Sequence, residues 1–388
     1  MRLARNYTPL NVNIVKGQDI YLWDNTGKKY IDLLAGYSAV NQGHCHPKLI
    51  NKMIQQANNI TLTSRVVNND KLNEWADYIT AKFKYGSVLA MNSGAEAVET
   101  AIKLAHKYGN NVLQIKKPLI ACLTNNFHGR TLGTLSLSDY KQYRDGFTPL
   151  NTNIIYIEMN DLTSLYDTFD KHRNNIAAFI YEPVQGEGGV MPITPEFAYA
   201  MEICKLENPD ILFMADEIQC GLGRICTMTA SETIFTNLRP DVLILGKALS
   251  GGIMPMSCIL ADDTIMSLFT AGTHGSTYGG NPLASAISIE ALKIIENECI
   301  PNVKNSIKHI VNKMESISNN NIVNIRGRGL FWGIQFDNNY DIEALRERML
   351  NAGYITCTSR FNTLRITPPL TITQTDFDKS IDTLNDLI

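Results

Sequence analysis

The chain has 388 residues, 44% of them hydrophobic, which is enough to bury a large core in two domains or lobes. Its formal net charge of −3 offers no basic field for nucleic acid, and no long apolar run or basic amphipathic stretch points to a membrane. Its eight cysteines are scattered without Cys-x-x-Cys spacing, which favours reduced thiols in a cytoplasmic protein. His44, Cys45 and His46 lack a second group of ligands, so the sequence predicts no metal site.

The N-terminal part is predicted to be a β-hairpin followed by an irregular segment. Strand-like runs at 20–23 and 29–33 flank a turn rich in Asp, Asn and Gly. Small and polar residues fill 36–44, and Pro47 then opens a helix. This part reads as the N-terminal segment, 1–45, of a small domain.

Strand-like and helical patterns alternate through the middle of the chain. Helices are predicted at 95–108 and 195–208, among others. The apolar strands are predicted at 88–91, 119–123, 154–157, 177–181, 211–215 and 242–245. Continuous apolar strands separated by helices indicate an α/β fold with a mainly parallel sheet covered on both faces. We assign this large domain to residues 46–285, with a ligand site at the carboxyl ends of its strands.

The C-terminal part, 286–388, is predicted to be a smaller α+β domain that also takes in the N-terminal segment. A long helix is expected from Pro282 to about Glu298, and a second from Val303. The remaining elements are short strands at 322–325 and 330–334, a helix at 342–352 and a last helix from Thr375.

Polar groups follow the predicted strands at the point where each strand ends. Lys247 follows an apolar strand directly, a setting that removes water from the ammonium and lowers the pKa of an imine-forming lysine. Asp216 ends the preceding predicted strand, and a buried carboxylate needs a cationic partner. Ser93 and Gly94 open a helix whose free N–H groups suit a phosphate.

Each of these signals has an ordinary structural explanation when it is taken alone. Ser93 and Asp216 could simply cap helices, while Phe127 and Arg130 could be a core aromatic and a surface cation. Their coincidence at one sheet edge is less easily explained by chance. An imine-forming lysine, a buried aspartate, a phosphate cup and an aromatic that stacks on a flat ring are the parts of a pyridoxal-phosphate site.

Longer stretches resemble the class III, fold-type I pyridoxal-phosphate aminotransferases over nearly the whole chain. The matching stretches are 92–97, 127–131, 182–187, 216–219, 245–252 and 274–282. Residues 37–47 further resemble the branch of this family that transfers the δ-amino group of ornithine to a 2-oxo acid. His128 departs from that branch, which often carries Trp here, and Phe127-His128-Gly129-Arg130 is common in the N-acetylornithine branch.

The resemblance implies a role for each residue that would hold pyridoxal 5'-phosphate. Lys247 forms the imine with the cofactor and carries the proton in transamination, and Asp216 pairs with the pyridine nitrogen. Gln219 bonds the phenolic oxygen, Phe127 and Ile218 cover the ring faces, and His128 belongs to the same pocket. The phosphate is held by Ser93, Gly94 and Ala95 of one subunit and by Ser276 and Thr277 of the partner subunit, so the resemblance implies a homodimer.

The resemblance also implies how the substrates bind. Arg130 takes a carboxylate of both substrates, and Tyr7 and Tyr37 place ornithine with its δ-amine at the reacting position. Glu187 masks Arg365 with an ion pair while ornithine is bound, and releases it for the second carboxylate of 2-oxoglutarate. The products are glutamate 5-semialdehyde, which cyclises to pyrroline 5-carboxylate, and glutamate.

Other functions remain open from the sequence. N-acetylornithine or another ω-amino acid is the nearest alternative substrate, although a residue smaller than Tyr37 is expected for it. An aminomutase would need no second substrate. A silent binding protein on this fold would have lost Lys247 or Asp216, and a nicotinamide dehydrogenase would carry GxGxxG after its first strand; the sequence shows neither feature.

Overall fold

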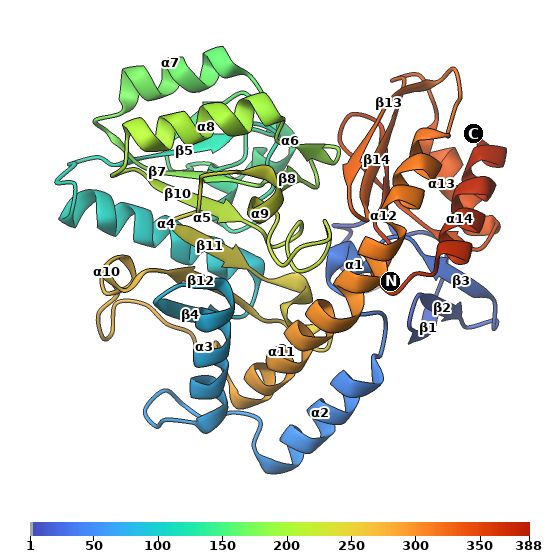
Figure 1. The fold of residues 1–388 in the computed structure, drawn as a ribbon, viewed down its shortest axis with the longest axis horizontal. Helices are drawn as coiled ribbons and strands as arrows, with labels where there is room; N and C mark the ends of the chain where they lie inside the picture. The colour runs from blue at the N-terminus through green and yellow to red at the C-terminus, as the bar shows by residue number, and fades with distance from the viewer. Residues whose placement is uncertain (1–2) are drawn as a thin grey trace.

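The computed structural model describes residues 3–388, which form a large lobe and a small lobe (Figure 1). The N-terminal strands lie beside the C-terminal helices in the small lobe, and the middle of the chain forms the large one (Figure 1). The two predicted boundaries, 45/46 and 285/286, stay predictions, since helix α11 (Pro282–Ile294) runs across the second.

The large lobe is built on a seven-stranded sheet. In spatial order its strands are Ser87–Met91 (β4), Ser257–Ala261 (β12), Val242–Leu245 (β11), Leu212–Asp216 (β10), Ile176–Tyr181 (β7), Leu119–Leu123 (β5) and Ile154–Ile157 (β6). Only β12 runs antiparallel to its neighbours, so the predicted mainly parallel sheet is confirmed. Asp216 pairs in register with Ile244, which puts the ends of β10 and β11 side by side.

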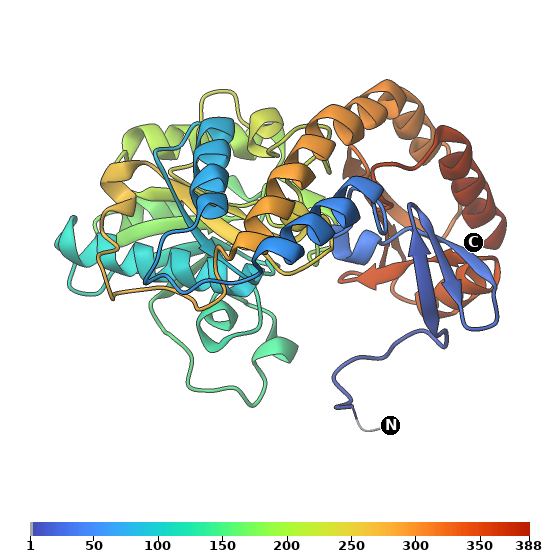
Figure 2. The same cartoon turned by 90° about the horizontal axis from the view of Figure 1, so that it is seen from below.

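Helices cover both faces of this sheet because its strands are apolar on both sides. Phe213 and Ala215 of β10 pack into one buried cluster with α3 (Asp70–Phe83), α7 (Leu162–His172) and α8 (Pro195–Glu207). Leu212 and Met214 pack into a second cluster with α4 (Gly94–Asn111). Successive side chains on a strand point to opposite faces, which explains this division. Figure 2 shows the sheet between the two helical layers.

The small lobe combines both ends of the chain. Strands Ile14–Gln18 (β1), Tyr21–Asp24 (β2) and Lys29–Asp32 (β3) form one sheet with Tyr354–Ile355 (β15). A second sheet contains Ile322–Arg328 (β13), Phe331–Phe336 (β14), Thr363–Ile366 (β17) and Cys357–Ser359 (β16). Helices α13 (Ile342–Asn351) and α14 (Gln374–Leu387) pack against these sheets. The prediction of a smaller α+β domain from the two termini is confirmed.

The long helical region after Pro282 differs from the prediction. The sequence predicted two helices with a break before Val303, but α11 continues through a π-helical turn, Ile295–Cys299, into α12 (Ile300–Glu315). Pro301 has no N–H to give to the helix, and the wider π turn directly before it accommodates that missing hydrogen bond. This helical connection joins the large lobe to the small one (Figure 1).

The remaining elements are short or lie at the edges of the two lobes. They are Ala35–Ser38 (α1), Pro47–Asn59 (α2), Leu132–Ser136 (α5), Lys141–Arg144 (α6), Val184–Gln185 (β8), Met191–Pro192 (β9), Ser231–Ile234 (α9) and Asp263–Met266 (α10). Within residues 3–388, none of the helices has both the length and the apolar composition needed to cross a membrane.

Replacing Phe213 should test how much the central strand depends on aromatic packing. The Phe213 ring is fully buried and lies 5.4 Å from the centroid of Phe179. Phe213→Ala would leave a cavity in the middle of the sheet, so we expect a loss of about 3–5 kcal/mol in the free energy of unfolding of the large lobe. Urea unfolding followed by circular dichroism measures it. Tyr199→Ala on α8, where the side chain is 65% exposed, is the matched control and should change little.

Candidate active site

The polar residues predicted from strand ends line one cavity at the carboxyl edge of the large sheet. The cavity has a volume of about 300 Å³ and is lined by Gly94, Ala95, Phe127, His128, Gly129, Arg130, Glu182, Asp216, Ile218, Gln219 and Lys247. A neighbouring cavity of about 410 Å³ shares Gly94 and Lys247 and extends to Ser93. Five strands, β4, β5, β7, β10 and β11, deliver these groups from distant parts of the sequence to one place.

Lys247 begins a single 3₁₀ turn, Lys247–Ser250, immediately after β11. Its φ angle of 46° lies in the left-handed region, a strained conformation that is concentrated at functional sites. Burial away from water, and secondarily the positive charge of Arg365, lower the pKa of Lys247 to about 8. A larger share of this amine than of an ordinary lysine is therefore unprotonated near neutral pH and able to act as a nucleophile.

Asp216 and His128 form a buried pair on the floor of the cavity. The Nδ1 atom of His128 lies 2.7 Å from Oδ2 of Asp216, and the Ile218 N–H donates to Oδ1 at 3.1 Å. Burial disfavours the imidazolium, but the hydrogen bond and the charge of Asp216 outweigh it and raise the pKa of His128. The His128 ring therefore orients the carboxylate, and the carboxylate in turn favours the protonated form of His128.

The start of α4 is shaped to receive an anion. Ser93 caps the helix by accepting the Glu96 N–H through Oγ, which leaves its own O–H free to donate. A Cβ on Gly94 would come within 3.0 Å of Ile218, so only glycine lets the backbone approach the cavity wall here. The Ser257 hydroxyl donates to the Ser93 carbonyl at 2.6 Å and holds the cap in place.

Ser276 and Thr277 lie on a surface loop close to this helix start. The Ser276 Oγ accepts a hydrogen bond of 2.8 Å from Asn92, the residue before Ser93, while Thr277 is exposed. Ser276 thus lies beside the start of α4 in its own chain, and Thr277 is accessible at the surface. Their predicted contribution to a second subunit stays a prediction.

Two unpartnered nitrogen atoms show that the cavity is built for a polar, flat ligand. The Nε2 atoms of His128 and Gln219 are buried and have no hydrogen-bond partner within residues 3–388. Buried polar groups are normally paired, so these atoms call for a ligand or water. With Phe127 and Ile218 on the walls and the helix start beside them, the residues present fit a phosphorylated pyridine ring.

Glu187 and Arg365 form an ion pair that links the two lobes. Arg365 Nη1 lies 2.7 Å from Glu187 Oε1, and the Arg365 side chain is completely buried on β17. Burial opposes ionisation of Glu187, but the charge and hydrogen bond of Arg365 hold the pKa of Glu187 below its ordinary value. Both groups are therefore charged, and the Arg365 Nη2 atom has no partner within residues 3–388.

The predicted tyrosines differ in where the structure places them. Tyr37 lies in α1, where Ala35, Gly36, Tyr37 and Ser38 all have positive φ angles and form a left-handed turn. Such a turn costs about 1–2 kcal/mol per non-glycine residue. The turn brings the Tyr37 ring within 5.2 Å of the Arg365 guanidinium. Tyr7 is 77% exposed in the segment before β1, which extends away from the small lobe (Figure 2), and it does not line either cavity.

Sequence reasoning assigned no role to Glu182, although it lines the cavity. Burial raises the pKa of Glu182 to about 7, although the charge of His128 acts in the opposite direction. Its Oε2 accepts the Phe127 N–H at 2.9 Å, which fixes the aromatic wall. The available signal was its position directly after β7, the same position that drew attention to Asp216 after β10.

Comparison with known proteins identifies the family. The profile of the aminotransferase class-III family matches residues 2–388. The chain belongs to the class III aminotransferase family. It is 43% identical to the ornithine aminotransferase of Bacillus cereus over 97% of this chain and 93% of that protein.

Two solved structures extend the comparison to the fold. The ornithine aminotransferase of Toxoplasma gondii, which has partial occupancy of PLP at its active site, matches with a TM-score of 0.95. It is 32% identical, and the match covers 100% of this chain and 91% of that one. The acetylornithine aminotransferase of Elizabethkingia anophelis matches with a TM-score of 0.88 and 35% identity, covering 100% and 96% of the two chains.

The pH dependence of Lys247 reactivity tests its environment directly. In cofactor-free protein we expect acylation of Lys247 to rise as pH increases through about 8, because the amine is the reactive form above its pKa. Peptide mass spectrometry after brief labelling at a series of pH values gives the profile. Lys48 is the matched control, because its bond to Glu298 raises its pKa and should delay its labelling to higher pH. Equal profiles for the two lysines would contradict the assigned environment.

Proposed function

We propose that the protein transfers the δ-amino group of L-ornithine to a 2-oxo acid, with pyridoxal phosphate as cofactor and 2-oxoglutarate as acceptor. The products are glutamate 5-semialdehyde, which cyclises to pyrroline 5-carboxylate, and glutamate. The observation that carries the proposal is the buried Glu187–Arg365 ion pair beside Tyr37. The class III family and the similarity to ornithine aminotransferases support it.

When bound, pyridoxal phosphate supplies an electron sink for the negative charge that develops on the carbon bearing the reacting amine. Asp216 would pair with the pyridine nitrogen, and His128 orients that carboxylate through its hydrogen bond. Gln219 would donate its free Nε2 to the phenolic oxygen, and Phe127 and Ile218 would cover the ring. Gly94 and Ala95 would hold the phosphate with N–H groups of the helix start, and Ser93 would hold it with its hydroxyl, because the Ser93 N–H donates to Glu96.

Lys247 is both the attachment point and the general base in this proposal. Its lowered pKa allows the amine to accept a proton from the substrate carbon and to return it at a neighbouring atom. Glu182 limits the positive charge of the pocket through its own ionisation near neutral pH. These groups would move or hold protons within the same cavity.

The substrate-binding residues have to accept two different molecules, the diamino acid ornithine and the diacid 2-oxoglutarate. Arg130 is exposed at the cavity and would bind the carboxylate common to both substrates. With Glu187 in place, Arg365 is neutralised and cannot attract a second carboxylate, so ornithine is accepted. When 2-oxoglutarate enters, its second carboxylate replaces Glu187 on Arg365. One site thus serves two substrates by changing the partner of a single guanidinium.

N-acetylornithine is the alternative substrate that a specific observation favours. The acetylornithine aminotransferase of Elizabethkingia anophelis has 35% identity to this chain, and Phe127-His128-Gly129-Arg130 is the form common in that branch. Against it stands Tyr37, which occupies the position where an acylated α-amine would need a smaller residue. Pyrroline 5-carboxylate formation from ornithine, compared with the rate of amino transfer from N-acetylornithine, decides between them.

The assembly and the cellular location are part of the same proposal. Ser276 and Thr277 would complete the phosphate site of the partner subunit in a homodimer, and their surface position supports this arrangement. All eight cysteines are free thiols, which supports a reducing compartment such as the cytoplasm.

Replacing Lys247 with alanine should abolish turnover and the absorbance of the lysine-bound cofactor. No other group lining the cavity offers an unprotonated amine. The experiment measures the visible spectrum of the reconstituted protein and pyrroline 5-carboxylate formation. Lys48→Ala, which removes an exposed lysine on α2, is the control and should keep both signals. Turnover retained by Lys247→Ala would overturn the proposal.

Replacing Glu187 with glutamine should shift amino-donor preference from ornithine towards glutamate. The unmasked Arg365 then attracts a second carboxylate in both half-reactions, and we expect a shift of about tenfold or more in the ratio of the two kcat/KM values. Single-turnover spectroscopy with each donor measures it. Glu343→Gln, which weakens the Arg346–Glu343 pair on α13 of the small lobe, should leave the ratio unchanged. An unchanged ratio in Glu187→Gln would refute the masking role.

A further inference from the structure

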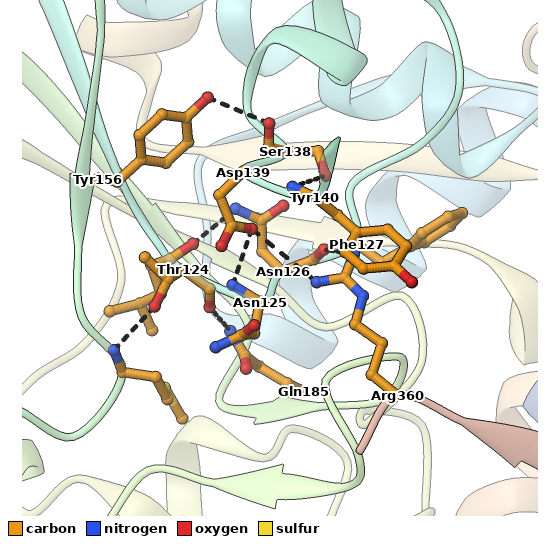
Figure 3. Close-up of polar contacts among 12 residues, drawn as sticks. Thr124, Asn125, Asn126, Phe127, Ser138, Asp139, Tyr140, Tyr156, Gln185 and Arg360 are labelled. Carbon is orange, nitrogen blue, oxygen red and sulfur yellow. Dashed lines mark hydrogen bonds and ion pairs between the residues drawn. The ribbon is translucent and has the colours of Figure 1, made fainter. Parts of the chain in front are cut away.

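Arg360 is a buried cation near the active site that neither the predicted site nor the proposed function uses. It lies in the turn between β16 and β17, and its side chain is only 7% exposed. Figure 3 shows it extending towards Asn126 and Asp139 of the large lobe. Its polar contacts are long, with Nη2 3.4 Å from the Asn126 carbonyl and Nη1 3.9 Å from Asp139. Nε and Nη1 have no hydrogen-bond acceptor within residues 3–388.

Two aromatic rings also lie against the Arg360 guanidinium. Its Cζ atom lies 4.0 Å from the ring centroid of Tyr140 and 5.1 Å from that of Tyr143. The two tyrosines pack edge to face at 4.8 Å. A guanidinium over an aromatic face is attracted by the ring quadrupole, and the attraction grows when water is excluded. Arg360 therefore holds the segment around α6 against the small lobe.

Tyr143 also stacks against Arg130. The Arg130 Cζ atom lies 3.8 Å from the ring centroid of Tyr143 and 5.4 Å from that of Phe127. No ion pair or side-chain hydrogen bond of Arg130 is found within residues 3–388. Stacking alone therefore places this guanidinium, and its N–H donors stay free for a carboxylate. Tyr143 lies in contact with both arginines, one from each lobe.

The turn that carries Arg360 is itself firmly held. Asn362 donates through Nδ2 to the carbonyls of Asp337 and Tyr340 at 2.6 and 2.9 Å. The Arg360 N–H donates to the Glu187 carbonyl at 3.2 Å. The turn leads directly into β17, which carries Arg365. The β16–β17 hairpin thus carries Arg365 itself and, through Arg360, contacts Tyr143, the ring on which Arg130 stacks.

We propose that Arg360 is a positioning residue that, through Tyr143, sets the place of Arg130 relative to Arg365. The inference rests on the proposed function, in which these two arginines bind the carboxylates of the diacid. The distance between two cationic groups determines which length of diacid can reach both. Arg360 therefore contributes to the selection of 2-oxoglutarate over its shorter and longer homologues.

The experiment compares Arg360→Met with wild-type holoenzyme. We expect KM for 2-oxoglutarate to rise about fivefold or more while kcat changes less than about twofold, since an aromatic–cation contact in a desolvated site has been removed. The preference for 2-oxoglutarate over oxaloacetate and 2-oxoadipate should fall. Arg360→Lys should recover part of it. Tyr143→Leu should reproduce the Arg360→Met profile, the double variant should be no worse than either, and Tyr143→Phe should resemble wild type.

A matched control uses the same kind of contact away from the site. Arg239 lies 4.0 Å from the ring centroid of Tyr85, so Arg239→Met removes an arginine–tyrosine pair without touching Arg130. It should leave KM and diacid preference unchanged. Unchanged diacid preference in Arg360→Met, or additive effects of Arg360→Met and Tyr143→Leu, would overturn the inference.

Binding of glutarate separates this inference from the proposed reaction. Glutarate has both carboxylates but no amino or oxo group, so titration calorimetry measures its affinity without turnover. Weaker glutarate binding in Arg360→Met supports the positioning role even if ornithine proves not to be the donor. Absence of ornithine turnover in the wild type would instead refute the proposed function alone.

Discussion

Charges held away from water at one edge of the sheet have to compensate one another, and the rest of the site depends on this constraint. Lys247 loses proton affinity through burial, while Glu182 gains it for the same reason. Asp216 is compensated by His128, and Arg365 by Glu187. Removing any one of these groups would leave another buried charge without its partner. The resulting loss in the free energy of unfolding is large for a protein of marginal stability. The two pairs and the lysine therefore form one electrostatic unit.

This unit joins the two lobes. Glu187 follows the large-lobe strand β8, and Arg365 comes from β17 of the small lobe, so their ion pair spans the boundary. Arg360, on the turn before β17, makes a second link through Tyr140 and Tyr143. Two small-lobe cations, Arg365 and Arg360, thus have partners in the large lobe. In the proposed function a substrate carboxylate replaces Glu187 on Arg365, which would couple substrate binding to the contact between the lobes.

Much of the fold and site was predictable because the signals are local. Apolar runs located β5, β6 and β11 at the residues observed. Polar residues after strands singled out Lys247 and Asp216, and the structure places both in one cavity. Strand β12 escaped prediction because it runs antiparallel and has no helix before it to reveal the alternation. Tyr7 was predicted from resemblance alone, and nothing in a short exposed segment constrains where its side chain lies.

The sequence by itself determined the class of fold and the family, and it placed Lys247 and Asp216 at the ends of apolar strands, since these features depend on residue type and on spacing along the chain. Only the tertiary structure showed that His128 bonds Asp216, that Glu182 titrates near neutral pH, and that Tyr143 contacts both Arg130 and Arg360. Arg130 and Arg360 are far apart in the sequence, and most of the residues of the large lobe lie between them. Both contact the ring of Tyr143 because the folded chain brings a small-lobe hairpin against a large-lobe loop. At the site, burial rather than residue type decides which groups have shifted pKa values.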